Sequence, residues 1–197
     1  MTLSIVMSAF RFLHLFGLVV GFGAAIFADL TFFRYGIVHP ISDYTIHQVK
    51  VLSRAASWGL ILLWLSGAGL IYFGYLGDPN YIYNEKLWGK IMIVMILTVN
   101  GIILHQMVFP AITAKKGFRL FDGATRGEEA ILIFMGMVSL VSWIVPFVLG
   151  KAPQLNYITP WWYVMIGWLI LLLVADVVAS LGFFVIKKIQ KAMHITG

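Results

Sequence analysis

The chain has 197 residues, of which 61% are hydrophobic and only 11% are charged. Soluble domains carry about 25% charged residues, so this composition excludes a soluble fold and indicates an integral membrane protein. The net charge of +6 does not indicate nucleic-acid binding, because the basic residues flank apolar segments, as membrane orientation requires. Cysteine is absent, which excludes disulfides, thiolate ligands and iron–sulfur clusters.

Five apolar segments are long enough to cross a bilayer, since a span needs roughly 20 apolar residues. All five are predicted to be helical, because hydrocarbon offers no water to satisfy exposed backbone groups. We therefore expect an all-α membrane protein, a bundle of five transmembrane helices that forms a single domain over residues 1–197. The predicted spans are 5–33, 55–76, 87–112, 128–149 and 161–186.

The distribution of lysine and arginine predicts the orientation of the bundle. The segments on one side hold ten basic residues and those on the other side hold three, which places the N-terminus outside and the C-terminus in the cytoplasm. The ten are Arg34, Lys50, Arg54, Lys115, Lys116, Arg119, Arg126, Lys187, Lys188 and Lys191, and the three are Lys86, Lys90 and Lys151. The two longer connections, 34–54 and 113–127, then lie in the cytoplasm, where either has room for a short interfacial helix.

In the first span, His14 lies about three turns inside the helix, and ionisable side chains are costly enough in a bilayer to suggest a function. A ligand role and a hydrogen bond to a neighbouring helix are the two interpretations of this histidine. Its face continues through small residues that include Gly17 and Gly21. Such a stripe fits either a flat cofactor lying on the backbone or close packing by a second helix, and both interpretations stay open.

Lys90 lies near the start of the third span. At 1.5 Å per residue, His14 is roughly 12–14 Å below the outer end of its helix, a level that the lysine side chain can reach. Arg11 lies one turn above His14. Two cations beside an imidazole favour an anionic ligand, and haem fits, with His14 as the axial ligand and the propionates near Lys90 and Arg11. The alternative for Lys90 is snorkelling to the interface.

A second set of polar residues lies deeper. His105 is roughly 26 Å from the outer end of the third span, so it cannot share one iron with His14. At a similar depth lies Asp176 of the fifth span, with Asn100 above both. These three form a candidate proton route from the cytoplasm, or a polar contact that only fixes helix register.

The runs Leu13-His14-Leu15-Phe16-Gly17 and Leu87-Trp88-Gly89-Lys90, with Arg34 after the first span and Asn100-Gly101 in the third, resemble a superfamily of small membrane proteins. It includes the HemJ-type protoporphyrinogen oxidases and the copper-resistance D membrane domain, and the resemblance covers residues 11–110. It implies a b-type haem and quinone-linked electron transfer, with His14 and Lys90 matching the important residues of the oxidases. Asn100 matches an asparagine of the copper group. The oxidases have four spans, and the segment after their first span differs from the one found here.

We therefore expect a quinone-linked redox protein that holds one haem b near the outer face, with His14 as the metal ligand. Gly17 and Gly21 would contact the porphyrin, and Lys90 and Arg11 would bind its propionates or assist proton transfer. The resemblance implies a bacterial inner membrane. Two other classes stay open, a copper-handling or transport protein and a structural subunit of a membrane complex or homo-oligomer. Met92 and Met95 are candidate soft ligands for iron or copper(I), or packing filler.

Overall fold

The computed structural model describes residues 2–34 and 39–195, and within these ranges it is helical, with no β-strand. Five helices are long and apolar enough to cross a membrane, which confirms the predicted all-α bundle. The long helices are α1 (Thr2–Phe33), α2 (Asp43–Gly77), α3 (Glu85–Ile103), α5 (Arg126–Gly150) and α6 (Trp161–Ile195). The shorter elements are η2 (Pro79–Tyr83), η3 (Leu104–Val108), α4 (Phe109–Ala114) and η4 (Pro153–Leu155), and η3 and α4 extend α3 into one continuous span.

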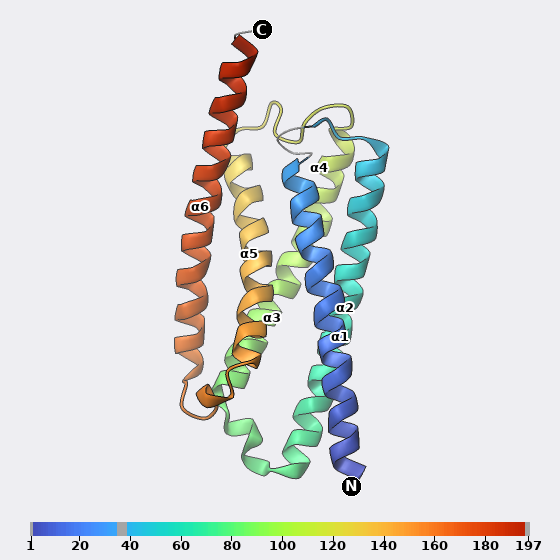
Figure 1. The fold of residues 1–197 in the computed structure, drawn as a ribbon, viewed down its shortest axis with the longest axis vertical. Helices are drawn as coiled ribbons and strands as arrows, with labels where there is room; N and C mark the ends of the chain where they lie inside the picture. Colours follow the sequence, from blue (N-terminus) through green and yellow to red (C-terminus); the bar gives the residue numbers. More distant parts are fainter. Residues whose placement is uncertain (1, 35–38, 196–197) are drawn as a thin grey trace.

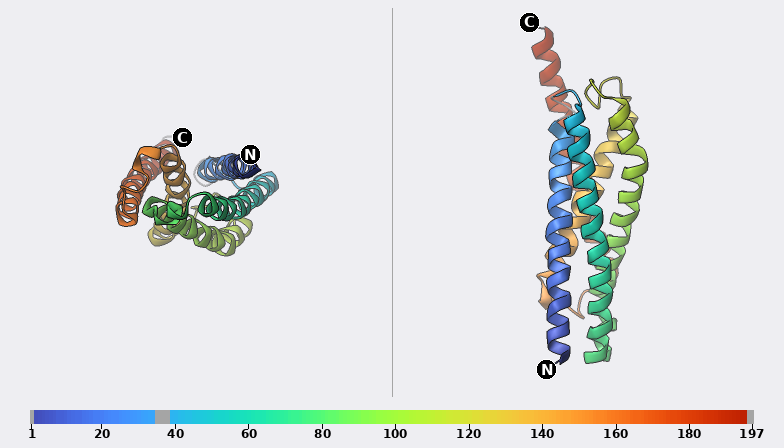
Figure 2. Two further views of the ribbon diagram at one scale, coloured as in Figure 1. Left: turned by 90° about the horizontal axis from the view of Figure 1, so that it is seen from below. Right: turned by 90° about the vertical axis from the view of Figure 1, so that its right-hand side faces the viewer.

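The helices run alternately in opposite directions, so α1 begins at one end of the bundle and α6 finishes at the other (Figure 1). We call these the N-terminal end and the C-terminal end. The bundle consists of two groups, one formed by α1 and α2 and the other by α3, α5 and α6 (Figure 2). Helix α1 also touches α5, whereas α2 packs closely along α1 but not along α3. The boundary between the two groups is where the cavity described below lies.

Helix α2 is longer than the second predicted span, and the expectation of a loop over residues 34–54 is wrong for its second half. The helix begins at Asp43, with Ser42 and Thr45 forming a capping box in which each side chain bonds the other's backbone. Thr45, Ile46 and Val49 are buried, so this extension packs on the rest of the molecule. Neither glycine nor proline interrupts the chain from Asp43 onward until Gly59, which explains why the helix runs on into the span.

The third span contains one irregular turn. Segment η3 is a π-helix, in which the backbone N–H of Phe109 donates to the carbonyl of Leu104, five residues back. Pro110 explains it, because proline has no N–H to donate and its ring would clash with the carbonyl of Gln106, four residues earlier. The π-turn widens the helix at His105.

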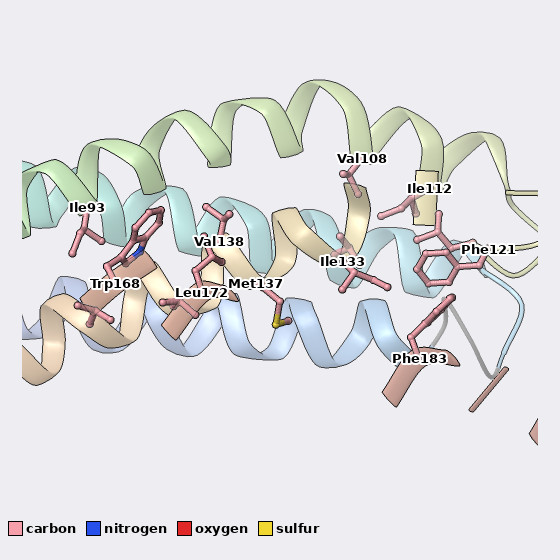
Figure 3. Packing of buried hydrophobic residues seen from close by; sticks show 14 of the residues in the cluster. Ile93, Val108, Ile112, Phe121, Ile133, Met137, Val138, Trp168, Leu172 and Phe183 are labelled. Atoms are coloured by element: carbon pink, nitrogen blue, oxygen red, sulfur yellow. The ribbon is translucent and has the colours of Figure 1, made fainter. Parts of the chain in front are cut away.

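The core lies mainly between α3–α4, α5 and α6 (Figure 3). Trp168 and Leu172 of α6 belong to the buried cluster together with Val138 of α5. Near the C-terminal end, Phe183 meets Phe121 of the α4–α5 connection edge to face, with ring centroids 4.7 Å apart. Many other apolar side chains are exposed on the outside, as a lipid-facing surface requires.

Candidate functional site

His14 lies in the half of the bundle nearer to the N-terminal end, and its ring faces α2. Its Nδ1 is 3.0 Å from the Oγ of Ser66, and the side chain is partly buried. A Cβ added to Gly67 would lie 3.5 Å from Cε1 of the ring, so the imidazole packs against the α2 backbone. The hydrogen bond to a neighbouring helix, one of the two interpretations of His14, is therefore present. It leaves the other open, because the ring has a second nitrogen.

The partners of Ser66 decide which nitrogen carries the proton. The Ser66 hydroxyl is 2.5 Å from the carbonyl of Leu62 and 3.3 Å from that of Leu63, and carbonyls only accept hydrogen bonds. The single hydroxyl proton is therefore used within α2, and Nδ1–H of His14 donates to Oγ. In the neutral ring, Nε2 then carries the lone pair, which is the arrangement of a histidine prepared to bind a metal.

The charge of Lys90 acts on the imidazole of His14, so the two side chains lie in the same region of the bundle, and their joint role at a cofactor stays a prediction. Lys90 is half-buried, and Lys86 one turn earlier acts on it in turn. It forms no hydrogen bond or ion pair with any residue in the described ranges. Arg11 is exposed and lies near Tyr81 of η2, where burial raises the pKa of the tyrosine hydroxyl and the Arg11 charge opposes that rise.

Gly17 and Gly21 are not free to contact a porphyrin, because α2 covers their face of α1. A Cβ on Gly17 would lie 3.0 Å from the carbonyl oxygen of Gly59, and one on Gly59 would lie 2.5 Å from the backbone nitrogen of Gly21. Trp143 of α5 covers Gly21 from a second side. The expected porphyrin contact at these glycines is thus corrected to helix packing, which is the common use of small-residue stripes in membranes.

Lys86 has a role that the sequence did not reveal. Its side chain is only 3% exposed, and its Nζ donates to the carbonyls of Leu149 and Ala152, at 3.1 and 2.8 Å. These carbonyls lie at and just beyond the C-terminus of α5, where backbone acceptors have no partner within the helix and a cation is favoured. Lys86 is therefore a buried helix cap, although it counts as a loop charge in the sequence.

The second polar region lies nearer to the C-terminal end, around His105 on the π-turn. Its Nδ1 is 3.0 Å from the carbonyl of Gly101, and its Nε2 is 2.8 Å from Oγ of Ser53 on α2. The carbonyl fixes the proton on Nδ1, so Nε2 of the neutral ring accepts from Ser53. Ser53 and Ser66 are 13 positions apart on α2, which puts the two histidines about 20 Å apart along the bundle, farther than the depths counted from the sequence.

A cavity of about 480 Å³ adjoins His105, within the size range of small-molecule sites. Its wall comes from α1, α2, α5 and the continuous helix of α3, η3 and α4. Most lining residues are apolar, and the wall also includes Asp29 of α1. From the sequence, Asp29 near the inner end of the first span is expected to pair with Arg34, but no ion pair joins them among the described residues. Its position in the cavity wall could have been suspected from the sequence, because Asp29 lies four positions after Ala25, on the same side of α1 as the small-residue stripe.

The three residues of the candidate proton route are not linked by hydrogen bonds among the described residues. Asn100 is buried and donates to the carbonyl of Met135 on α5. Asp176 lies on α6, which takes no part in the cavity wall, and its Oδ1 is buried without a partner in residues 2–34 and 39–195. His105 bonds α2 and its own helix instead.

A second, shallower hollow gathers methionines that are spread along the sequence. It lies between α3, α5 and α6, and Met92, Met95 and Met135 line it together with Asn100. No group of three His, Asp or Glu side chains that could hold a metal ion occurs in the described part of the chain.

No known protein family, curated protein or solved structure matches the chain. The function must therefore be argued from the geometry alone.

Proposed function

We propose that this protein binds one b-type haem through Nε2 of His14 and transfers electrons in the membrane, with a quinone as exchange partner. The observation that carries the proposal is the bond from Nδ1–H of His14 to Ser66, because it orients the ring and leaves Nε2 with the lone pair. A haem would supply one-electron chemistry that no side chain of this chain offers.

The cations around His14 support an anionic cofactor. Lys90 acts on the imidazole and forms no ion pair within the described residues, so its charge is available to a propionate or to a proton-transfer step. Arg11, one turn toward the N-terminal end, supplies a second, exposed charge. Gly17 and Gly21 are not part of the proposal, since α2 occupies their face.

The positive-inside rule gives the proposed orientation, with the N-terminal end outside and the C-terminal end in the cytoplasm. The burial of Lys86 strengthens this argument. A lysine that caps a helix inside the bundle does not count as a loop charge. The difference in the number of loop lysines and arginines between the two ends is therefore larger than the sequence count suggests. A bacterial inner membrane is the proposed location.

The test is the absorption spectrum of the full-length protein, purified from cells supplied with haem. We expect a Soret band corresponding to about one haem per chain, its loss in His14→Ala, and about tenfold weaker binding in Ser66→Ala, which removes only the orienting bond. His105→Ala is the matched control, because His105 also bonds a serine of α2 but uses both ring nitrogens. A wild-type protein without a Soret band, even after reconstitution, contradicts the proposal, as does full haem retention by His14→Ala.

A copper-handling function is the second candidate, favoured by the hollow that Met92, Met95 and Met135 share. Thioether sulfurs are soft ligands that suit copper(I). Metal analysis that finds copper and no iron, with copper lost on replacing Met92 and Met95 by leucine, would select this function over haem binding. If neither metal is found, and the His14→Ala, Lys90→Ala double variant behaves like wild type in its membrane complex, the chain is a structural subunit.

A further inference from the structure

The cavity beside His105 opens toward the lipid. Two residues of its wall, Ile61 of α2 and Ile102 of α3, are also exposed on the outside of the bundle. Although side-chain hydrogen bonds of Trp64 to Thr98 and of Ser53 to His105 link α2 to this span, helix α2 does not pack closely along α3. A molecule dissolved in the hydrocarbon can therefore reach the cavity sideways, which favours a ligand with a large apolar part.

Four polar side chains of the wall have partners within the protein, whereas Gln106 and Ser139 form no hydrogen bond with a described residue. Ser53 bonds His105, Ser57 donates to the backbone carbonyl of Ser53, and Thr98 donates to its own helix while accepting from an indole N–H of α2. Asp29 is different, because its Oδ2 is buried and has no hydrogen-bond partner in the described ranges. An unpaired polar atom in an apolar site is costly, so a ligand group that reaches Asp29 from the cavity and donates to it would relieve that cost.

The charge of the wall defines the ligand further. Neither lysine nor arginine contributes to it, and His105, the other ionisable residue, has its ring nitrogens bonded to Gly101 and Ser53. The wall therefore combines a large apolar surface with one carboxyl group, that of Asp29, and contains no lysine or arginine that could pair with it. A molecule that complements it carries one positive charge with an N–H donor, since a carboxylate and an ammonium group form a strong, charge-assisted hydrogen bond.

We propose that this cavity binds a lipophilic ammonium ion, a protonated amine with an apolar body, whose N–H group donates to Asp29. A metal ion matches the site less well, because the wall supplies one carboxylate where hard cations need several oxygen ligands. This site is about 20 Å from His14 along the bundle, so the proposal is independent of haem binding.

The experiment measures binding of tritiated 1-naphthylmethylamine to the full chain in phosphatidylcholine nanodiscs, with empty nanodiscs subtracted. We expect saturable binding of about one amine per chain, and binding at least about tenfold weaker in Asp29→Asn, which keeps the shape of the side chain and removes its charge. Asp176→Asn is the matched control, because Asp176 is also a partly buried carboxyl group with an unpartnered oxygen but lies on α6, outside the cavity. It should bind like wild type.

Two further measurements test the ligand class and the place. The neutral alcohol 1-naphthalenemethanol should bind at least about tenfold more weakly than the amine. Gly136→Leu should block binding by filling the cavity, since a Cβ there meets no atom within 4 Å, whereas the equally open Gly167 on α6 should accept leucine without effect. Absence of saturable binding, equal binding of alcohol and amine, or unchanged binding in folded Asp29→Asn and Gly136→Leu protein would each overturn the proposal.

Discussion

The two halves of this bundle contain the same small motif in different surroundings. His14 and His105 each place an imidazole nitrogen on a serine of α2, at 3.0 and 2.8 Å. Around His14 the helices are regular, packed backbone to backbone through glycines, and flanked by cations. Around His105 the helix widens into a π-turn, and a cavity with a lone carboxylate lies beside it.

Both histidines bond a serine of α2, so the difference between them is the use of the other ring nitrogen. The Nδ1–H of His105 donates a hydrogen bond to the carbonyl of Gly101, and its Nε2 accepts one from Ser53. Both ring nitrogens are therefore engaged within the protein. The Nδ1–H of His14 donates to Ser66, and this bond leaves the Nε2 lone pair unused. The proposed haem ligand and the proposed amine site are thus in separate halves of the bundle.

The largest effect should come from Gly59→Leu, which tests whether the His14 half is as tightly packed as its glycines indicate. A side chain at Gly59 would run into the backbone of Gly21, so α1 and α2 would have to separate. We expect a loss of about 3 kcal/mol or more in the free energy of unfolding, or no folded protein. Gly101→Leu, where a Cβ meets nothing within 4 Å, is the counterpart in the His105 half and should cost much less. Equal melting temperatures of the two variants would refute the difference in packing.

A smaller loss is expected from Lys86→Met, because this substitution removes the two hydrogen bonds that cap α5. The methionine keeps the apolar length of the side chain, so the cost should be about 1.5–3 kcal/mol, the range for hydrogen bonds to a charged group. Lys151→Met changes an exposed lysine at the same end and should leave stability unchanged. Denaturant unfolding in detergent compares the two, and an equal effect would mean that charge alone, without the buried cap, matters at this end.

The serine pair gives the next effect in size. Ser66→Ala leaves the Nδ1–H of a partly buried His14 without an acceptor, which should cost about 1–2 kcal/mol. Ser53→Ala should cost less than about 1 kcal/mol, because His105 is exposed and keeps its bond to Gly101. Thermal unfolding of both variants provides the measurement. A larger loss from Ser53→Ala would reverse the comparison between the halves.

The smallest effect concerns alkaline pH at the N-terminal end. Burial raises the pKa of Tyr81 in the folded protein, so the unfolded chain loses this proton first as the pH rises. The stability that comes from keeping Tyr81 neutral is complete below the ordinary tyrosine pKa of about 10 and is lost as the pH rises through the folded value. Melting temperatures should therefore fall less in Tyr81→Phe than in wild type above that pH. In Arg11→Ala, ultraviolet titration should place the pKa of Tyr81 still higher, and an unchanged or lower pKa would show that Arg11 does not act on it.

The sequence predicted the five helices because hydropathy is a local property that each segment carries by itself. It also predicted that the side chains of His14 and Lys90 reach similar depths, since depth follows from counting residues. The use of Gly17 could not be decided in that way, because a glycine stripe has the same appearance whether a cofactor or Gly59 lies on it. Lys86 was missed for a related reason. Its acceptors belong to the far end of α5, more than sixty positions away.

The cavity was beyond prediction because it depends on how far α2 stands from α3 and on a single irregular turn. Asp29 is near the end of the first predicted span, where a carboxylate is ordinary at a membrane interface. Only the packing of α1 against α2 and α5 makes it a buried group whose Oδ2 has no hydrogen-bond partner in the described ranges. Such a site exists in the tertiary structure and leaves little trace in any one segment.

The π-turn amounts to one surplus residue in the third span. The buried positions of this stretch are Asn100, Val108 and Ile112, eight and four residues apart, and the widened turn lies between the first two. If the same residues were wound as a regular α-helix, with the surplus residue kept, the positions beyond it would be turned by about 100°. Homologues that lack both the extra residue and Pro110 should retain five spans and the bond between His14 and Ser66, yet have no counterpart of the cavity that Asp29 lines.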